Sequence, residues 1–218
     1  MKFSDLTLLE SLPYFTIEAV KQLGEDKDTA PDTIRTALYR WMKTGRVIQI
    51  KKGIYTTRRF YELHRSDENF SMAISAIIMP QSYVSLEFIL QRNAILTDIT
   101  YPISAITTKN TRTIENALGT FSYRHIKDEL YQGYSISNYF GILFAQASVT
   151  KALFDYLYLR PNIGNFSSSS HNLAEDLRLN LDEFSASNQE EFATYVESSK
   201  SSKMNRILEN LRSTVWQH

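Results

Sequence analysis

The sequence predicts an α+β protein, and three observations support this class. Residues 31–43 carry apolar side chains at helical spacing and are followed by two short β-branched segments. Residues 97–145 are rich in Ile, Thr, Tyr and Phe, a composition typical of strands. Helical spacing returns in SVTKALFDYLYLR (148–160) and again after residue 171.

The composition is that of an ordinary globular protein. Of the 218 residues, 43% are hydrophobic and 22% are charged, with 24 basic and 24 acidic side chains. Cysteine is absent, which excludes disulfides, thiolate zinc sites and a cysteine nucleophile. The N-terminal stretch contains acids and no long apolar run, so we expect neither a signal peptide nor a membrane span. These features favour a cytoplasmic protein without a membrane partner.

Two short helices are predicted near the start of the chain. Ser4 can cap the first of them, which runs through Leu9. Thr16 can cap the second, TIEAVKQLG, which stops at Gly24. Residues 25–30 (EDKDTA) then predict a turn that leads into a third helix.

The third helix gives the clearest periodic signal. Pro31 suits its first position, because the missing N–H would be unpaired there, and Gly45 ends it. RVIQI, KKG and IYTT then predict a strand, a tight turn at Gly53 and a second strand. The apolar face of the helix holds Ile34, Ala37, Leu38, Trp41 and Met42. The opposite face holds Thr33, Arg35, Thr36, Tyr39, Arg40 and Lys43.

A run without acidic residues covers this helix, the hairpin and its exit strand. From Thr33 to Tyr61 there is no Asp or Glu, although the whole chain has a net charge of zero. Eight basic residues give this stretch a charge of +8, which points to an anionic partner. From residue 161 onward the balance reverses, with eight acids against five bases. The eight basic residues are Arg35, Arg40, Lys43, Arg46, Lys51, Lys52, Arg58 and Arg59.

Three helices followed by a hairpin are the order of a winged helix-turn-helix, whose third helix enters the major groove of DNA. The hairpin would lie along the backbone or in a minor groove. Hydrogen-bond donors on the outer face of the helix can contact base edges and so read the DNA sequence. The other basic side chains can contact phosphates, which position the protein on the duplex without reading its sequence. We expect Thr33, Arg35, Thr36 and Tyr39 at base edges and Arg40, Lys43, Arg46, Lys51 and Lys52 at phosphates, with Arg58 and Arg59 completing the set.

Other interpretations of this basic segment stay open. It could be a solvated face of a small structural domain. Winged helices also serve as protein-interaction modules, in which case an acidic protein would be the partner. Double-stranded DNA is the partner that the charge pattern favours, and we expect a homodimer on DNA.

The middle and end of the chain complete the predicted organisation. Residues 66–81 predict a linker and an apolar helix that stops at Pro80, and SLEFILQRN (85–93) predicts another helix. NIGNFSSSS (162–170) predicts a loop or linker before two or three amphipathic helices. The predicted regions are a winged helix-turn-helix at 1–62, an α+β domain at 68–161 and a helical region at 162–218, packed on the second domain.

Catalytic signals are weak in this sequence. The four histidines are scattered without metal-ligand spacing, and no phosphate-binding or hydrolase motif occurs. Pairs of adjacent Asp and Glu residues do occur, but their polar surroundings are typical of solvent-exposed surfaces and not of a catalytic site. A nuclease that uses Glu87 or Asp128 is the enzymatic alternative. We predict no enzymatic activity, no metal and no cofactor.

Several segments resemble those of a known family. SYVSLEFIL (82–90), AITTKNTRTIENALGTFSYRHI (105–126) and ASVTKALFDYLYLRP (147–161) are similar to signature segments of the AbiEi-type antitoxins. RWMKTGRVIQIKKGIYTT (40–57) is similar to the wing region of that family. The resemblance covers about residues 5–215, and the FSYRHI block is its more specific part.

The resemblance implies the repressor and antitoxin component of a bacterial type IV toxin–antitoxin system. Such a protein binds inverted repeats in its own promoter and counters a cognate nucleotidyltransferase-like toxin. A regulator that stands alone without a toxin is the alternative. The polar motif residues carried over by position are Ser82, Ser85, Glu87, Lys109, Arg112, Tyr123, Arg124 and His125, some holding the sheet and others forming the antitoxin surface.

The sequence also departs from the family pattern at one point. Family members often carry Pro-Glu before Lys-Ala-Leu, whereas Val149 and Thr150 precede Lys151 here. The helix that begins at this point therefore lacks its proline and its first-turn acid.

Overall fold

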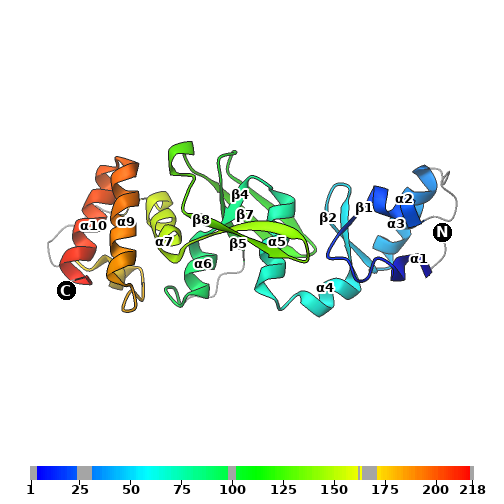
Figure 1. Ribbon diagram of the computed structural model, residues 1–218, viewed down its shortest axis with the longest axis horizontal. Coiled ribbons are helices and arrows are strands. Elements are labelled where there is room, and N and C mark those ends of the chain that lie inside the picture. The colour runs from blue at the N-terminus through cyan, green and yellow to red at the C-terminus, as the bar shows by residue number, and fades with distance from the viewer. Residues whose placement is uncertain (1–3, 24–30, 98–101, 162, 164–170, 217–218) are drawn as a thin grey trace.

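The computed structural model describes residues 4–23, 31–97, 102–161, 163 and 171–216. It shows a mixed α+β fold with two sheets, which confirms the predicted class at this level. In Figure 1 the N-terminal helices lie at one end of an elongated molecule, the larger sheet lies in the middle, and α9 and α10 lie at the other end. The predicted helix stop at Gly24, the turn at 25–30, residues 98–101 and most of the predicted linker at 162–170 lie outside the described residues.

The first part of the chain forms a small unit around its own apolar core. Its helices are α1 (Ser4–Thr7), α2 (Ile17–Leu23) and α3 (Pro31–Lys43). Its antiparallel sheet has the order β1-β3-β2, formed by β1 (Phe15–Thr16), β3 (Ile54–Thr57) and β2 (Val47–Lys51). The core collects the buried side chains Leu6, Leu9, Phe15, Val20, Ile34, Leu38, Trp41, Val47 and Tyr55.

Two boundaries in this unit differ from the prediction. The first helix ends at Thr7 and not at Leu9, because the next amides bond carbonyls only three residues back, as in Leu9 N to Leu6 O at 2.9 Å. The segment after β3 is not an exit strand but a helix, α4 (Arg58–His64). The Thr57 side chain starts α4 by accepting a hydrogen bond from the Phe60 amide at 3.1 Å.

A six-stranded mixed sheet forms the middle of the molecule, in the order β6-β7-β5-β4-β9-β8. The β5–β7 and β4–β9 pairs are parallel, and the other three are antiparallel. Strand pairs so distant in sequence could not be derived from periodicity alone. The strands are β4 (Ser82–Val84), β5 (Ile103–Thr107), β6 (Arg112–Asn116), β7 (Gly119–His125), β8 (Tyr134–Tyr139) and β9 (Ile142–Ala147).

Helices cover both faces of this sheet. The helix α5 (Glu68–Ile78) packs on one face, where Tyr123 of β7 reaches it, and α6 (Leu86–Arg92) and α7 (Val149–Leu159) pack on the other. Neighbouring residues along a strand point to opposite faces, so Tyr123 meets α5 while Arg124 meets the end of α7. A short 3₁₀ helix at Asp128–Leu130 precedes β8.

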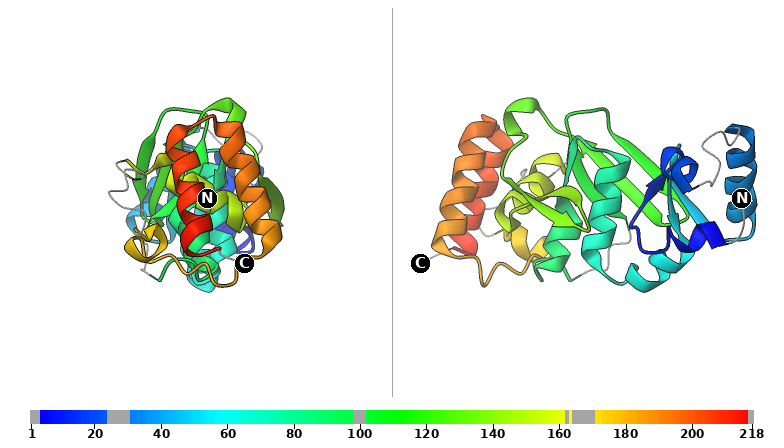
Figure 2. Two further views of the ribbon diagram at one scale, coloured as in Figure 1. Left: turned by 90° about the vertical axis from the view of Figure 1, so that its left-hand side faces the viewer. Right: turned by 45° about the vertical axis from the view of Figure 1, so that its right-hand side comes forward.

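The C-terminal region shares the core of the central sheet. It consists of α8 (Leu173–Asp176), α9 (Ala186–Ser199) and α10 (Ser202–Thr214). Figure 2 shows α9 and α10 side by side, and α9 also packs on α7, where Phe154 meets Phe192 edge-on at 6.3 Å between ring centroids. None of the described helices is long and apolar enough to cross a membrane.

The N-terminal unit joins the central sheet through its hairpin and α4. Ile50 and Phe60 belong to the large central core, and the Phe60 ring lies 5.9 Å from Phe70 of α5. The Asn116 side-chain amide donates to the Ile50 carbonyl at 2.9 Å. The hairpin is therefore held on both sides, by its own unit and by the sheet.

Candidate nucleic-acid interface

The outer face of α3 is polar, basic and open to solvent. Its inner face is fixed by the buried side chains of Ile34, Leu38 and Trp41. The apolar side chains recur every three or four residues, so the residues between them must point outward. All six residues expected on the outer face are exposed: Thr33, Arg35, Thr36, Tyr39, Arg40 and Lys43.

Three of the predicted arginines have carboxylate neighbours. Arg35 pairs with Asp32 at 3.3 Å, and Arg58 pairs with Glu62 at 3.4 Å. Arg59 pairs at 3.3 Å with Glu10, which lies in the turn after α1 and is distant in sequence. Exposed pairs of this kind contribute at most about 1 kcal/mol, so each arginine can exchange its carboxylate for a phosphate at little cost. The run free of acids in sequence is thus partly neutralised in space.

Arg40, Lys43 and Lys52 form the uncompensated part of the surface. All three are exposed. Within the part of the chain that the structure describes, no carboxylate lies within 4.0 Å of their charged groups. Arg46 is also exposed and lies at the start of the hairpin. These residues are the best placed of the predicted set to meet an anion.

Lys51 departs from the role expected for it. Its side chain is half-buried and its Nζ donates to the Ile77 carbonyl at 2.5 Å, near the end of α5. The last carbonyls of a helix lack partners inside the helix and attract cations, which explains this contact. The ammonium group of Lys51 therefore holds the hairpin to the central domain and does not face outward with Lys52.

The eight polar residues singled out by the sequence resemblance separate into three groups. Ser82, Ser85 and Tyr123 are buried and hold elements together. The Ser82 hydroxyl donates to the Met79 carbonyl at 2.6 Å, and the Tyr123 hydroxyl donates to the Ser75 carbonyl at 2.9 Å. Ser85 donates to Asp155 at 2.8 Å. These three residues are structural.

The second and third groups reach the surface. Glu87 and Arg124 line a hollow of about 360 Å³ together with Tyr156 and Arg160. The Arg124 guanidinium donates to the Leu159 carbonyl at 2.9 Å, which anchors it at the end of α7. The third group is exposed at one end of the β5–β6–β7 ladder and contains Lys109, Arg112 and His125. The structure therefore does not bring the eight motif residues into one site.

A buried ion pair is the main feature that the sequence analysis missed. Lys151 and Asp155 are fully buried in α7 and contact each other directly. Asp155 also accepts hydrogen bonds from the Tyr83 hydroxyl at 2.9 Å and from Ser85. The signal was present in the segment KALFD, where two opposite charges stand four residues apart on a helix with no polar face.

Burial and charge act against each other in this pair. Burial raises the pKa of Asp155 and lowers the pKa of Lys151, because both charged forms lose water. The opposite charge of the partner counters both changes. The aromatic ring of Phe154 also lies 4.8 Å from Lys151 Nζ, which favours the cation. The pair joins α7 to β4 through the Tyr83 hydroxyl, and neither Lys151 nor Asp155 lines the hollow that contains Glu87 and Arg124.

The structure shows how α7 begins at Val149 without the proline and first-turn acid that the resemblance implies. Ser148 caps α7 by accepting a hydrogen bond from the Lys151 amide at 3.0 Å, so the helix begins without a proline. Thr150 is buried, and its hydroxyl accepts from the Asn188 side chain of α9 at 2.9 Å. Thr150, where the resemblance noted in the sequence implies an acid, thus links α7 to the C-terminal helices.

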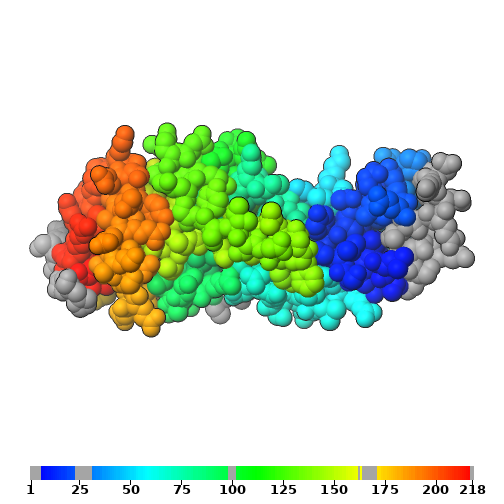
Figure 3. Space-filling model, viewed as in Figure 1, coloured from blue at the N-terminus to red at the C-terminus, as the bar shows by residue number. Residues whose placement is uncertain are grey.

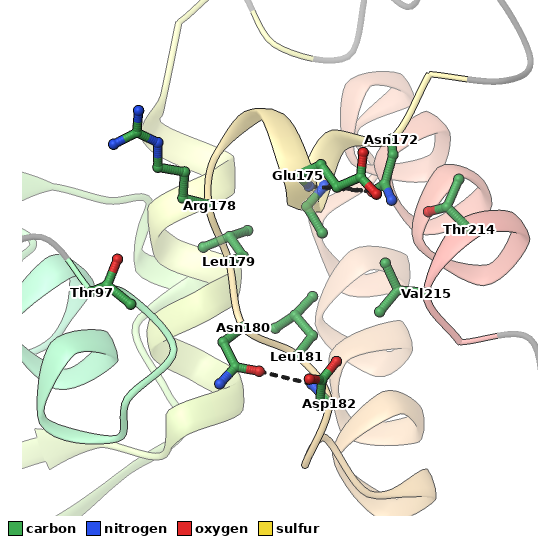
Figure 4. A pocket seen from close by; sticks show the side chains of 11 residues that line it. Thr97, Asn172, Glu175, Arg178, Leu179, Asn180, Leu181, Asp182, Thr214 and Val215 are labelled. Atoms are coloured by element: carbon green, nitrogen blue, oxygen red, sulfur yellow. Dashed lines mark hydrogen bonds between the residues drawn. The ribbon is translucent and has the colours of Figure 1, made fainter.

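A larger hollow of about 560 Å³ lies beside α8 (Figure 4). Its wall combines Leu179 and Leu181 with polar groups, including Asn180, whose side chain accepts from the Asp182 amide at 3.3 Å. Among the described residues, no group of three His, Asp or Glu side chains could hold a metal ion. All the residues that line this hollow except Thr97 belong to the C-terminal region. The helices α9 and α10 of that region lie at the opposite end of the molecule from α3 (Figure 1).

Geometry therefore defines a mixed α+β protein with an exposed basic helix at one end. A comparison with known protein families finds no match to this chain, and a search of curated proteins finds none either.

Proposed function

We propose that this protein is a DNA-binding transcriptional regulator, whose residues 1–62 act as a winged helix-turn-helix. The observation that carries the proposal is the outer face of α3, where every predicted contact residue is exposed while the inner face is fixed in the core. A helix of this kind fits a major groove, and its neighbouring cations suit the phosphates on either side.

The proposed contacts are of two kinds: some read the DNA bases, and others position the protein on the phosphate backbone. Thr33, Arg35, Thr36 and Tyr39 lie toward the middle and start of α3 and would meet base edges. Arg40, Lys43, Arg46 and Lys52 would neutralise phosphates, and Arg58 and Arg59 would exchange their carboxylates for further phosphates. Lys51 is left out of this set, because its ammonium group is bound to α5.

The family resemblance supports a second part of the proposal. The protein would repress its own promoter at inverted repeats and would counter a nucleotidyltransferase-like toxin in the cytoplasm, without a cofactor or catalysis of its own. Lys109, Arg112 and His125 are the exposed motif residues available for contact with such a toxin. If no toxin gene neighbours the gene of this protein and no toxin is neutralised on co-expression, the regulator acts alone.

A pair of single-charge variants tests the DNA-binding proposal. Arg40→Ala and Lys51→Ala each remove one positive charge, but only Arg40 is exposed on α3. Measured by fluorescence anisotropy on DNA from upstream of the gene, Arg40→Ala should weaken binding roughly tenfold. Lys51→Ala should change it by about twofold or less.

Two outcomes would count against the proposal. The wild-type protein would bind upstream DNA no better than a scrambled duplex of equal length, or the two variants would weaken binding equally. A pulldown that recovers an acidic protein and never DNA would favour the protein-interaction module instead.

A further inference from the structure

The two edges of the central sheet differ in how they are protected. The edge strand β6 (RTIEN) carries Arg112 and Glu115, both exposed. The opposite edge strand, β8 (YSISNY), carries no charge, and no charged residue occurs between Glu129 and Lys151. Charges, prolines and bulges on edge strands prevent pairing with another chain, and β8 has none of the three, pairing with β9 in an unbroken register.

Exposed apolar side chains lie directly beside this edge. Ile136 of β8 is 68% exposed and Leu143 of β9 is 64% exposed. The register pairs Ile136 with Ala145 and Asn138 with Leu143, so Ile136 and Leu143 are diagonal neighbours on the same face. In Figure 3 the β8–β9 segment is visible on the near face, beside the N-terminal unit. The pattern is an unpaired edge bordered by an apolar strip.

The hairpin turn fixes which backbone groups of β8 are unpaired. Phe140 and Gly141 connect the strands, and both have positive φ, 49° and 82°. A two-residue turn of this type closes on a hydrogen-bonded pair, here Tyr139 and Ile142. Alternate residues of β8 therefore bond β9, while Tyr134, Ile136 and Asn138 direct their N–H and C=O groups outward.

We infer that β8 is a homodimer interface, in which it pairs in antiparallel register with β8 of a second copy. A two-fold axis perpendicular to the sheet keeps each face on its own side, so even-numbered residues must meet even-numbered residues. With Ile136 opposite its own copy, Tyr134 faces Asn138 of the partner chain, and three pairs with two hydrogen bonds each are completed.

This register also covers the apolar strip. Ile136 meets its symmetry mate, and the two copies of Leu143 flank them, giving one continuous patch across the interface. A strand without charge can meet itself without repulsion, which is the reason to choose a second copy over a charged partner strand. The inference stands apart from DNA binding, because it involves no residue of the proposed nucleic-acid interface.

A single introduced cysteine gives a direct test, because the chain has no cysteine of its own. Ile136→Cys should place its thiol opposite that of the second copy, at the wider spacing of a hydrogen-bonded pair, so a short bis-maleimide crosslinker should convert most of the protein into a covalent dimer on a denaturing gel. The matched control is Thr113→Cys, an exposed position on the charged edge strand β6, which should remain mostly monomeric.

Sedimentation of the untagged protein completes the experiment. The wild type and Ile136→Val should reach twice the 25.2 kDa chain mass in the micromolar range. Ile136→Lys should stay at the chain mass with an unchanged circular dichroism spectrum. A wild type that stays at the chain mass at all concentrations, or equal crosslinking of the two cysteine variants, would overturn the inference. Retained dimerisation of a folded Ile136→Lys protein would place the interface elsewhere.

Discussion

Inside the central domain, the Lys151–Asp155 ion pair is buried and joins α7 to β4. Both side chains lie in the core, and Asp155 also binds hydroxyls from β4 and the turn after it. Removing one member of a buried pair leaves the other charge without compensation, which costs more than removing both. This asymmetry makes the pair testable.

Asp155→Leu should lower the free energy of unfolding by about 3–5 kcal/mol, since Lys151 then lacks its partner. The double variant Lys151→Met with Asp155→Leu should be more stable than the single variant, because no unpaired charge remains. Urea denaturation followed by circular dichroism measures both. Equal destabilisation by the two variants would show that Lys151 finds another partner.

Individual residues also show which contacts could be predicted from the sequence and which could not. The outward positions of Arg40 and Lys43 followed from the periodicity of α3 and are confirmed as exposed. The contact of Lys51 with Ile77 was missed, because it joins residues 26 positions apart. Likewise, the approach of Glu10 to Arg59 depends on the fold and has no local signal.

Secondary-structure elements followed the sequence where their signals were local. The third helix, the hairpin and the apolar helix at 66–81 are observed as α3, β2–β3 and α5. The helix α4 was missed, because Thr57 acts both as the end of a strand and as a helix cap. The strand order of the larger sheet is set by long-range packing and could not be predicted.

The contact between β7 and α5 has a pH-dependent component. Burial raises the pKa of Tyr123 to about 12, while a tyrosine in an unfolded chain titrates near ~10. At a pH between these two pKa values, the Tyr123 hydroxyl is deprotonated in the unfolded chain but stays protonated in the folded protein. The free energy of unfolding should therefore fall as the pH rises above about 10.

Tyr123→Phe removes this contribution. The variant should lose about 1 kcal/mol at neutral pH, from the hydrogen bond to the Ser75 carbonyl, but should lose less further stability between about pH 9 and 11 than the wild type. Urea denaturation at several pH values measures the slope. Tyr39→Phe, at an exposed position on α3, is the control. Equal slopes for wild type and Tyr123→Phe would contradict this prediction.

Across the whole molecule, charge is distributed unevenly although its sum is zero. The stretch from Thr33 to Tyr61 carries +8, and residues from 161 onward carry eight acids and five bases. In Figure 1 these parts lie at opposite ends, so one end of the protein attracts polyanions while the other does not. Such an arrangement would orient the basic end toward a polyanion such as the proposed DNA partner.

The salt dependence of DNA binding tests this account most directly. Each phosphate that a cation neutralises contributes roughly −0.9 to the slope of log affinity against log salt concentration. With Arg40, Lys43, Arg46 and Lys52 on phosphates, the slope for upstream DNA should be about −3.6 or steeper. The measurement is a titration of wild-type protein into labelled upstream duplex at several salt concentrations. A steep slope together with preference over scrambled DNA is the predicted result, and a slope near zero would contradict the account.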